Sequence, residues 1–284
     1  MKICRFNHGR LGIVEGSTVL DVTDALAVIP SVTYPYPRHD PLIAHLPALM
    51  ARMRELAPNA PRLPLADIQV QLPLANPGKI IAAPVNYTNH LKEVLDDPNL
   101  HHNNQINHIE RAGLFLKAQS SLADPCDGVH LTMPERRTDH EVELVIVIGK
   151  TARNVERDQA LSYVAGYCIG LDITIRGPEE RSFRKSPDTY TLMGPWLTTP
   201  DDIPDVSALD LALNVDDEVR QSSNTSQLIL GVPELIAFAS RFYTLHPGDV
   251  IFTGTPEGVG PIKAGQQIHA RIEGLGELKV DVHA

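Results

Sequence analysis

The chain has 284 residues, of which 43% are hydrophobic and 21% charged, a composition that excludes intrinsic disorder and suffices for one large core with a small satellite. Its formal net charge of −10 excludes nucleic acid and anionic membranes as expected partners, because both require a concentrated positive field. No apolar run has the length of a membrane span or signal peptide, and Cys4, Cys126 and Cys168 are too scattered for a disulfide framework or zinc site. We therefore expect a cytoplasmic protein that binds a small molecule or a second copy of itself.

The first 70 residues are expected to form a small domain and a connector. Residues 1–26 alternate short apolar strands with glycine turns and end in a brief helix, which is typical of a small α/β cap domain. Residues 30–78 are rich in proline around one helical stretch near Ile43 to Leu56. We place the boundary near residue 70, so that residues 1–70 form the cap with its connector and residues 71–284 the main domain.

The main domain is expected to be β-rich and of the α+β class. Short apolar runs alternate with Gly, Pro and Asp turns, and a clear helical pattern interrupts them at residues 233–245. The segment "GTPEGVG" (254–260) is rich in glycine, but it lacks the Lys-Ser/Thr ending of a phosphate-binding loop. A nucleotide-binding function is therefore not indicated.

A histidine and a glutamate follow the first apolar run of this domain. In "NYTNHLKE" (86–93), Thr88 or Asn89 could cap a short helix on which His90 and Glu93, three residues apart, share a face. A histidine polarised by a carboxylate is a competent base for activating water near neutral pH. A lone pair of this kind is more often a surface histidine beside a solvated glutamate, so the spacing alone leaves both interpretations open.

Two acidic side chains stand at the front of an apolar strand. In "TDHEVELVIVIGK" (138–150), alternation places Glu141 and Glu143 on one face, about 7 Å apart at about 3.3 Å per residue. Close like charges at a half-buried site either raise a pKa or require a cation between them. Oxygen ligands favour Mg²⁺, Mn²⁺ or Ca²⁺ over zinc. The alternative is a solvated strand end with Arg136 or Arg137 nearby.

A third carboxylate lies in the next apolar strand. In "YCIGLDITIRG" (167–177), alternation places Asp172 on the same face as Gly170, Thr174 and Arg176. Asp172 could join Glu141 and Glu143 at a metal ion; alternatively, it could lie on the polar face of an edge strand, or it could pair with Arg176 four residues later. The pattern is specific only in combination with the other motifs.

In combination, the motifs resemble those of the fumarylacetoacetate hydrolase family over nearly the whole chain. The resemblance rests on ordered segments: "GRLGIVEG", "VNYTNHLKE", "FLKAQSS", "DHEVELVIVIGK", "GYCIGLDITIR", "KSPDTYTLMGPW", "QSSNTSQLI" and "PGDVIFTGTPEGVG". It implies a mixed β-roll in the larger C-terminal domain, a small N-terminal cap, and assembly as a homodimer.

The resemblance also implies roles for individual residues. The metal ligands would be Glu141, Glu143 and Asp172. The catalytic pair would be His90 and Glu93, with Lys185 and Arg176 as cations at the reacting group. Contacts to the substrate would come from Asn86, Tyr87, Gly254 and Thr255.

These roles fit the hydrolysis of a 2,4-dioxo acid, an acylpyruvate such as fumarylpyruvate. The cofactor would be Mg²⁺, or Mn²⁺ or Ca²⁺, acting as template and Lewis acid for the 2-oxo acid. Water deprotonated by His90 would attack the distal carbonyl, and pyruvate would leave as its enolate. The same site could serve an oxaloacetate-type decarboxylase or a 2-hydroxydienedioate isomerase, and a binding protein without catalysis is a third possibility.

The chain departs from the family pattern at two places. Gly177, Pro178 and Glu179 replace the family's usual residues after the arginine, including a carboxamide that assists the oxyanion. Ser186 and Pro187 follow Lys185 where an aromatic residue is usual. Residues 95–113 separate the His–Glu segment from the next strand and could form a lid over the substrate.

Overall fold

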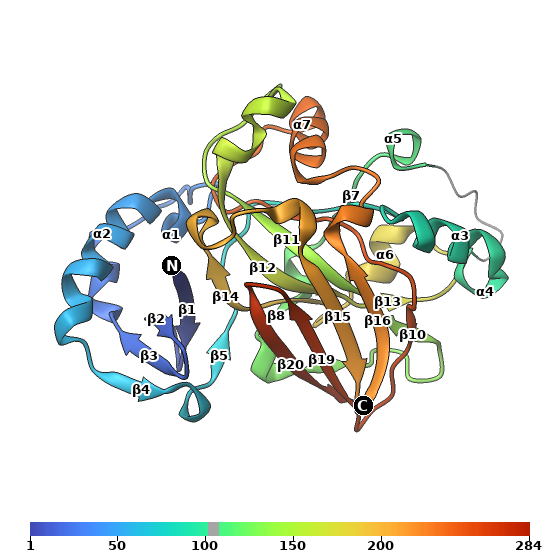
Figure 1. Cartoon of the computed structure of the whole chain (residues 1–284), viewed down its shortest axis with the longest axis horizontal. Coiled ribbons are helices and arrows are strands. Elements are labelled where there is room, and N and C mark those ends of the chain that lie inside the picture. Colours follow the sequence, from blue (N-terminus) through green and yellow to red (C-terminus); the bar gives the residue numbers. More distant parts are fainter. Residues whose placement is uncertain (102–107) are drawn as a thin grey trace.

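The computed structural model describes residues 1–101 and 108–284 and has a small N-terminal part beside a larger, sheet-rich body (Figure 1). The N-terminal part is a meander of β1 (Lys2–Phe6), β2 (Arg10–Glu15), β3 (Thr18–Asp21) and β4 (Arg62–Pro64). The helices α1 (Pro41–Ala44) and α2 (Leu46–Leu56) cover it, after a 3₁₀ turn at Thr23–Val28. The predicted strands, brief helix and later helical stretch are confirmed.

The meander continues into the largest sheet of the molecule. Its strand order is β4-β3-β2-β1-β14-β12-β11-β17-β6-β7, with β5 (Val70–Gln71) paired to β1 and β8 (Leu122–Ala123) paired to β14. The remaining strands of this sheet are β6 (Ile80–Ala82), β7 (Phe115–Lys117), β11 (Val142–Ile148), β12 (Val164–Asp172), β14 (Thr191–Thr198) and β17 (Val250–Phe252).

Two further sheets complete the body. A five-stranded sheet has the order β16-β15-β19-β20-β9, with bounds β9 (Val129–His130), β15 (Asp210–Val215), β16 (Glu218–Asn224), β19 (Gln267–Ile272) and β20 (Gly276–His283). A three-stranded sheet joins β13 (Thr174–Ile175), β10 (Thr138–His140) and β18 (Gly260–Pro261).

Short helices lie around these sheets. They are α3 (Thr88–Asp96), α4 (Pro98–His101), α5 (Ile109–Ala112), α6 (Arg181–Lys185) and α7 (Val232–Phe242). The predicted β-rich α+β class is confirmed, and α7 accounts for most of the pattern at 233–245. No helix in the described ranges is both long and apolar enough to cross a bilayer. The centre of the expected lid, residues 102–107, lies outside the described residues, so the lid stays a prediction.

Strand β11 is buried on both faces, and its side chains divide between two hydrophobic cores. Leu144 and Ile146 pack in the core between the large and the five-stranded sheets, whereas Val145 and Val147 pack toward the N-terminal part. The predicted alternation of faces is confirmed. Because the second core includes residues such as Ile3, residues 1–70 share sheet and core with the rest, and the domain boundary near residue 70 stays a prediction.

Candidate metal centre and active site

The three predicted metal ligands converge at one end of the central strand pair. Glu141 and Glu143 stand at the start of β11, Asp172 ends β12, and the backbone N–H of Asp172 donates to the carbonyl of Glu141 at 3.0 Å. One carboxylate oxygen from each residue lies within 4.8 Å of the others, and all three residues are buried. The antiparallel pairing of two short-range sequence motifs therefore builds a cluster of oxygen ligands.

Glu143 is the carboxylate that most requires a cation. It accepts a hydrogen bond from the backbone N–H of Gly254 at 2.6 Å, and in the described part of the chain no lysine or arginine forms an ion pair with it. Burial, followed by the negative charge of Asp172, raises the pKa of Glu143 well above its usual range. A buried, uncompensated carboxylate beside two others suits a hard divalent cation such as Mg²⁺ or Mn²⁺.

The other two ligands are held by lysines. Lys185, the last residue of α6, donates to Glu141 Oε2 at 2.7 Å and Asp172 Oδ2 at 2.6 Å. Lys117 on β7 pairs with Asp172 Oδ1, and burial lowers its pKa. Burial alone would raise the pKa of Glu141, but Lys185 and then Arg176 hold that pKa far below its usual range. The prediction placed Lys185 at this site, whereas Lys117 was missed.

Arg176 orients Glu141, one of the predicted metal ligands, and does not pair with Asp172. Its Nε donates to Asp139 Oδ2 at 2.7 Å and its Nη2 to Glu141 Oε1 at 2.8 Å. The alternative pairing of Asp172 with Arg176 is therefore wrong. Arg137 likewise binds Asp139, at 2.8 and 3.0 Å, and not the glutamate pair.

Glu179, one of the residues that depart from the family pattern, is bound by an arginine. Arg136 Nη1 and Nη2 donate to the two carboxylate oxygens of Glu179 at 2.9 and 2.8 Å, and both residues are half-buried. This ion pair lowers the pKa of Glu179. Arg136 is therefore engaged with Glu179 and does not neutralise the strand glutamates.

The His90–Glu93 pair forms on α3 as predicted. His90 Nδ1 lies 2.7 Å from Glu93 Oε2, while Glu93 Oε1 accepts from the backbone N–H of Gly258 at 2.9 Å. A carboxylate at Nδ1 favours a proton on that nitrogen and leaves the Nε2 lone pair available as a base. The predicted cap is wrong, because Tyr87 occupies the N-cap position without a side-chain hydrogen bond and Thr88 is already helical.

One small cavity, of ≈ 40 Å³, collects these groups. Its lining consists of Ala83, Pro84, Val85, His90, Phe115, Glu141, Glu143, Asp172, Arg181, Lys185 and Thr255. His90, the three carboxylates and two cations, Arg181 and Lys185, thus face the same cavity.

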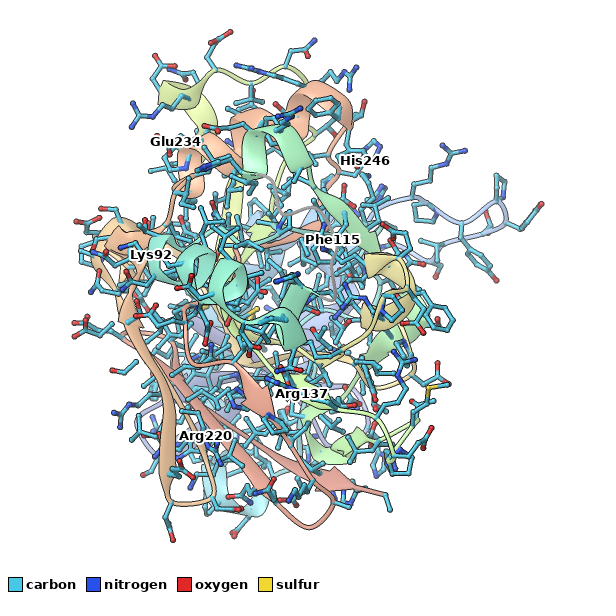
Figure 2. All side chains as sticks on the ribbon, turned by 90° about the vertical axis from the view of Figure 1, so that its right-hand side faces the viewer. Lys92, Phe115, Arg137, Arg220, Glu234 and His246 are labelled. Carbon is cyan, nitrogen blue, oxygen red and sulfur yellow. The ribbon has the colours of Figure 1, made fainter. Side chains whose placement is uncertain are left out.

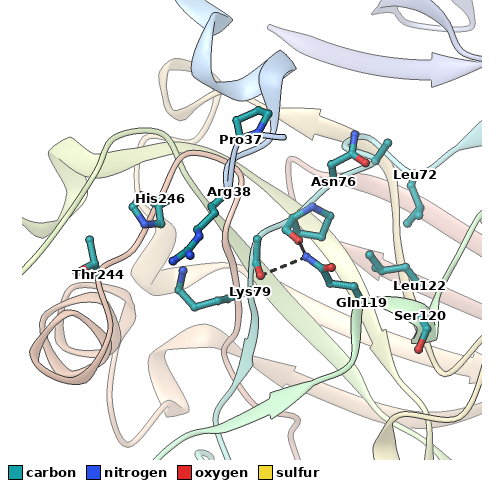
Figure 3. A pocket seen from close by; sticks show the side chains of 13 residues that line it. Pro37, Arg38, Leu72, Asn76, Lys79, Gln119, Ser120, Leu122, Thr244 and His246 are labelled. Carbon is teal, nitrogen blue, oxygen red and sulfur yellow. Dashed lines mark hydrogen bonds between the residues drawn. The ribbon is translucent and has the colours of Figure 1, made fainter. Parts of the chain in front are cut away.

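A larger cavity of ≈ 1180 Å³ lies elsewhere, beside the proline-rich connector (Figure 3). Arg38, Lys79 and His246 gather on one side of it, and Gln119 on the other donates to the carbonyl of Gly78 at 3.2 Å. None of the predicted site residues lines it, so size alone does not identify the functional site.

Of the predicted substrate contacts, Thr255 is the one that lines the small cavity. Its Oγ accepts a hydrogen bond from Gln221 Nε2 at 2.8 Å, which leaves the hydroxyl proton of Thr255 free to donate. Gln221 Oε1 accepts in turn from the backbone N–H of Val142 at 3.0 Å. Gln221 begins the "QSSNTSQLI" segment, but its type and spacing gave no sign of this role.

The other three predicted substrate contacts, Asn86, Tyr87 and Gly254, are buried or hydrogen-bonded within the protein. Asn86 donates to the carbonyls of Leu230 and Thr253, both at 2.9 Å, and accepts from the Leu230 N–H, so its amide is already used. Gly254 gives its N–H to Glu143. Tyr87 is fully buried, and burial raises the pKa of its hydroxyl. The contacts of Asn86 and Gly254 favour support of the site over direct binding of a substrate.

The fold and this constellation define a class of protein. Residues 79–283 match the family model of the fumarylacetoacetate hydrolase C-terminal domain, and the chain belongs to that family. The family and the hydrolase class predicted from the motifs are confirmed.

Individual relatives within this family are similar to the chain over its whole length. The chain is 60% identical to a maleylpyruvate hydrolase from Aquipseudomonas alcaligenes over the full length of both proteins. It superposes on the crystal structure of maleylpyruvate hydrolase from Sphingobium sp. SYK-6 in complex with manganese(II) and pyruvate, with a TM-score of 0.84, 42% identity, and coverage of 100% of this chain and 99% of the other. It also resembles a 5-carboxymethyl-2-hydroxymuconate delta-isomerase from Mycobacterium smegmatis, with a TM-score of 0.71, 27% identity, and coverage of 100% and 99%.

Proposed function

We propose that this chain is a divalent-metal-dependent hydrolase of acylpyruvates, with maleylpyruvate or its trans isomer fumarylpyruvate as the first substrate to test. The observation that carries the proposal is the set of three buried carboxylates within 4.8 Å, next to a His–Glu pair in one cavity. The relative with 60% identity and the Sphingobium structure with manganese and pyruvate support the same activity.

The donor set determines which ions suit the site. Glu141, Glu143 and Asp172 offer oxygen ligands alone, so Mg²⁺, Mn²⁺ or Ca²⁺ would be held, with Mn²⁺ also found in the relative's complex. When bound, the ion would supply Lewis-acid polarisation and a template for the 2-oxo acid.

The chain's own residues would carry the proton transfers. His90 Nε2 would take a proton from water, and Glu93 would hold the ring and stabilise its positive charge. The oxygen of that water attacks the distal carbonyl carbon, and the bond between this carbon and the methylene of the pyruvate unit breaks. The bonding electrons remain on the pyruvate unit, which is released as an enolate and takes up a proton. The other product is the acid of the acyl group.

Two further side chains are placed to hold the substrate. Thr255 can donate its hydroxyl proton to a carboxylate, because Gln221 already donates to its oxygen. Lys185 faces the cavity and can stabilise negative charge on the reacting group once its carboxylate partners bind a metal ion. Both roles are specific to an anionic substrate.

The isomerase relative at 27% identity motivates the second candidate. An isomerase or a 2-oxo acid decarboxylase would use the same cation and an enolate, but it would not need water as a nucleophile. Assembly as a homodimer and a cytoplasmic location remain predictions, which size-exclusion chromatography with light scattering and cell fractionation can test.

The deciding experiment follows two products separately. The protein is loaded with Mn²⁺ or Mg²⁺ and given maleylpyruvate, fumarylpyruvate, acetylpyruvate and oxaloacetate, while pyruvate and carbon dioxide are measured. Hydrolysis predicts pyruvate and the acyl acid in equal amounts, lost on chelation and in His90→Ala. An absorbance change without cleavage selects the isomerase, carbon dioxide from oxaloacetate selects the decarboxylase, and full activity in excess chelator overturns the proposal.

A further inference from the structure

One cation in the small cavity, Arg181, forms no ion pair with the residues that the structure describes, although the charges of Glu180, Glu141 and Asp172 act on it at longer range. Arg181, the first residue of α6, lines the cavity with the three carboxylates and Lys185. Among the described residues, Arg181 makes no ion pair or hydrogen bond through its guanidinium, and burial lowers its pKa. Glu180, its neighbour, instead uses its carboxylate to accept from the Ser182 N–H at 2.9 Å.

The other cations around the site are already engaged. Each contacts a carboxylate or a backbone carbonyl: Lys117 with Asp172, Lys185 with Glu141 and Asp172, Arg176 with Asp139 and Glu141, Arg136 with Glu179, Arg137 with Asp139, and Arg184 with the carbonyl oxygens of Glu179 and Ile175. A guanidinium facing a cavity without such a partner is costly unless a ligand supplies the anion.

Arg181 is held in place by an aromatic ring. Its guanidinium carbon lies 5.5 Å from the centre of the Phe115 ring, and Lys185 Nζ lies 5.6 Å from the same centre. Phe115 is on β7, on the face of the molecule turned toward the viewer in Figure 2. Stacking on a ring fixes the plane of a guanidinium while leaving its N–H groups free, which prepares it for a planar carboxylate.

The spacing along α6 separates two ends of a ligand. Lys185 contacts the metal-ligand carboxylates, and Arg181 lies four residues earlier on the same face of the helix. One helical turn corresponds to about 5.4 Å, which a few carbon–carbon bonds of about 1.5 Å can span. A ligand with its 2-oxo acid end at the carboxylate cluster would therefore bring an acyl-side carboxylate near Arg181.

We propose that Arg181 binds a second, distal carboxylate of the substrate, so that the site is selective for acylpyruvates whose acyl group ends in a carboxylate. This inference rests on the proposed function and narrows it to dicarboxylic substrates. The bidentate fork of arginine matches the planar carboxylate, and the partial burial of the cavity strengthens the pair. Arg181 thus determines specificity, while the His–Glu pair and the metal site determine the chemistry.

The kinetic test compares two substrates that share the pyruvate end. Arg181→Ala is expected to lower kcat/KM for maleylpyruvate by about 10- to 100-fold, mainly through KM, because a charge-assisted pair is lost. For acetylpyruvate, which has a methyl group in place of the alkenyl carboxylate, the change is expected to stay within about threefold. Arg181→Met keeps the packing on Phe115 and is expected to behave like the alanine variant. For Arg181→Lys, we expect kcat/KM for maleylpyruvate to lie between those of the wild type and the alanine variant. Lys92→Ala is the control, since Lys92 is exposed on α3 (Figure 2).

A binding test does not depend on turnover. Calorimetry with the manganese-loaded protein compares 2-oxoheptanedioate with 2-oxoheptanoate, which has the same number of carbons but no distal carboxylate. Arg181→Ala is expected to weaken the binding of 2-oxoheptanedioate at least about tenfold and to leave the binding of 2-oxoheptanoate unchanged.

The outcomes separate this inference from the proposed function. An equal loss on maleylpyruvate and acetylpyruvate would show that Arg181 serves the chemical step and would overturn the inference, as would no loss on either. If the wild-type protein hydrolyses no acylpyruvate, the proposed function fails, and the calorimetric pair still decides whether Arg181 reads a distal carboxylate. If Arg181→Ala changes the binding of the two 2-oxo acids equally, the calorimetric test overturns the inference about Arg181.

Discussion

Glu93 Oε2 lies 2.7 Å from His90 Nδ1, and the second oxygen of Glu93 is fixed by the Gly258 N–H. Glu93→Gln keeps the shape but can present an amide N–H to Nδ1, which favours the wrong tautomer of the base. We expect Glu93→Gln to lower kcat at least about tenfold and His90→Ala to lower kcat by about 10²- to 10⁴-fold. Steady-state pyruvate release measures both, with Lys92→Ala as the control on the same helix. Unchanged kcat in Glu93→Gln would remove Glu93 from the catalytic pair.

Metal binding should depend on Glu143 more than on surface charge. Mn²⁺ is expected to raise the melting temperature of the wild-type protein, because the ion binds the folded state and neutralises a buried carboxylate. Glu143→Gln should abolish most of this rise and lower the affinity for Mn²⁺. Glu135→Gln, at an exposed position, should change neither. Thermal unfolding with and without Mn²⁺ measures the difference. An equal rise in both variants would place the ion elsewhere.

Lys185 should contribute to stability as well as to the site. Lys185→Ala leaves Glu141 and Asp172 with less positive charge in a buried environment, so we expect a loss of about 3 kcal/mol in the metal-free protein. Lys263→Ala, on an exposed turn, should change stability by less than about 0.5 kcal/mol. Urea unfolding compares the two alanine variants. Similar midpoints would mean that the ion pairs of Lys185 do not stabilise the protein.

Gly254 and Gly265 form a matched pair of backbone positions. Both have positive φ, +99° and +89°, but a Cβ at Gly254 would lie 2.8 Å from Asn86 Cβ, whereas at Gly265 no atom lies within 4 Å. Gly265→Ala should cost about 1 kcal/mol and leave activity intact. Gly254→Ala should cost more, and it should weaken metal binding because its N–H holds Glu143. Unfolding curves and Mn²⁺ titrations separate strain from function, and equal metal affinity in both variants would contradict this role.

Local periodicity accounts for the parts of the site that were predicted. The period of two along β11 placed Glu141 and Glu143 on one face, and the three-residue spacing placed His90 beside Glu93. Family motifs then joined Asp172 to the glutamates, although the pairing of β11 with β12 is what brings them together.

Contacts between distant segments account for what was missed. The hydrogen bonds of Asn86 reach Leu230 and Thr253, and no local pattern shows that its amide is already used. Arg176 lies near the acids as predicted, but its partners, Asp139 and Glu141, depend on the antiparallel pairing of β10 with β13. The available guanidinium of Arg181 depends on every neighbouring ion pair, which a single sequence does not reveal.

Asp172 has both of its oxygens engaged, one by Lys117 and the other by Lys185. Each of these oxygens has a second lone pair, so a divalent ion at this carboxylate would sit beside an ammonium group or displace it. The free energy of ion binding would then be a difference between two strong attractions. We therefore expect that shortening one of these lysines strengthens the hold on the ion while it removes a positive charge from the site.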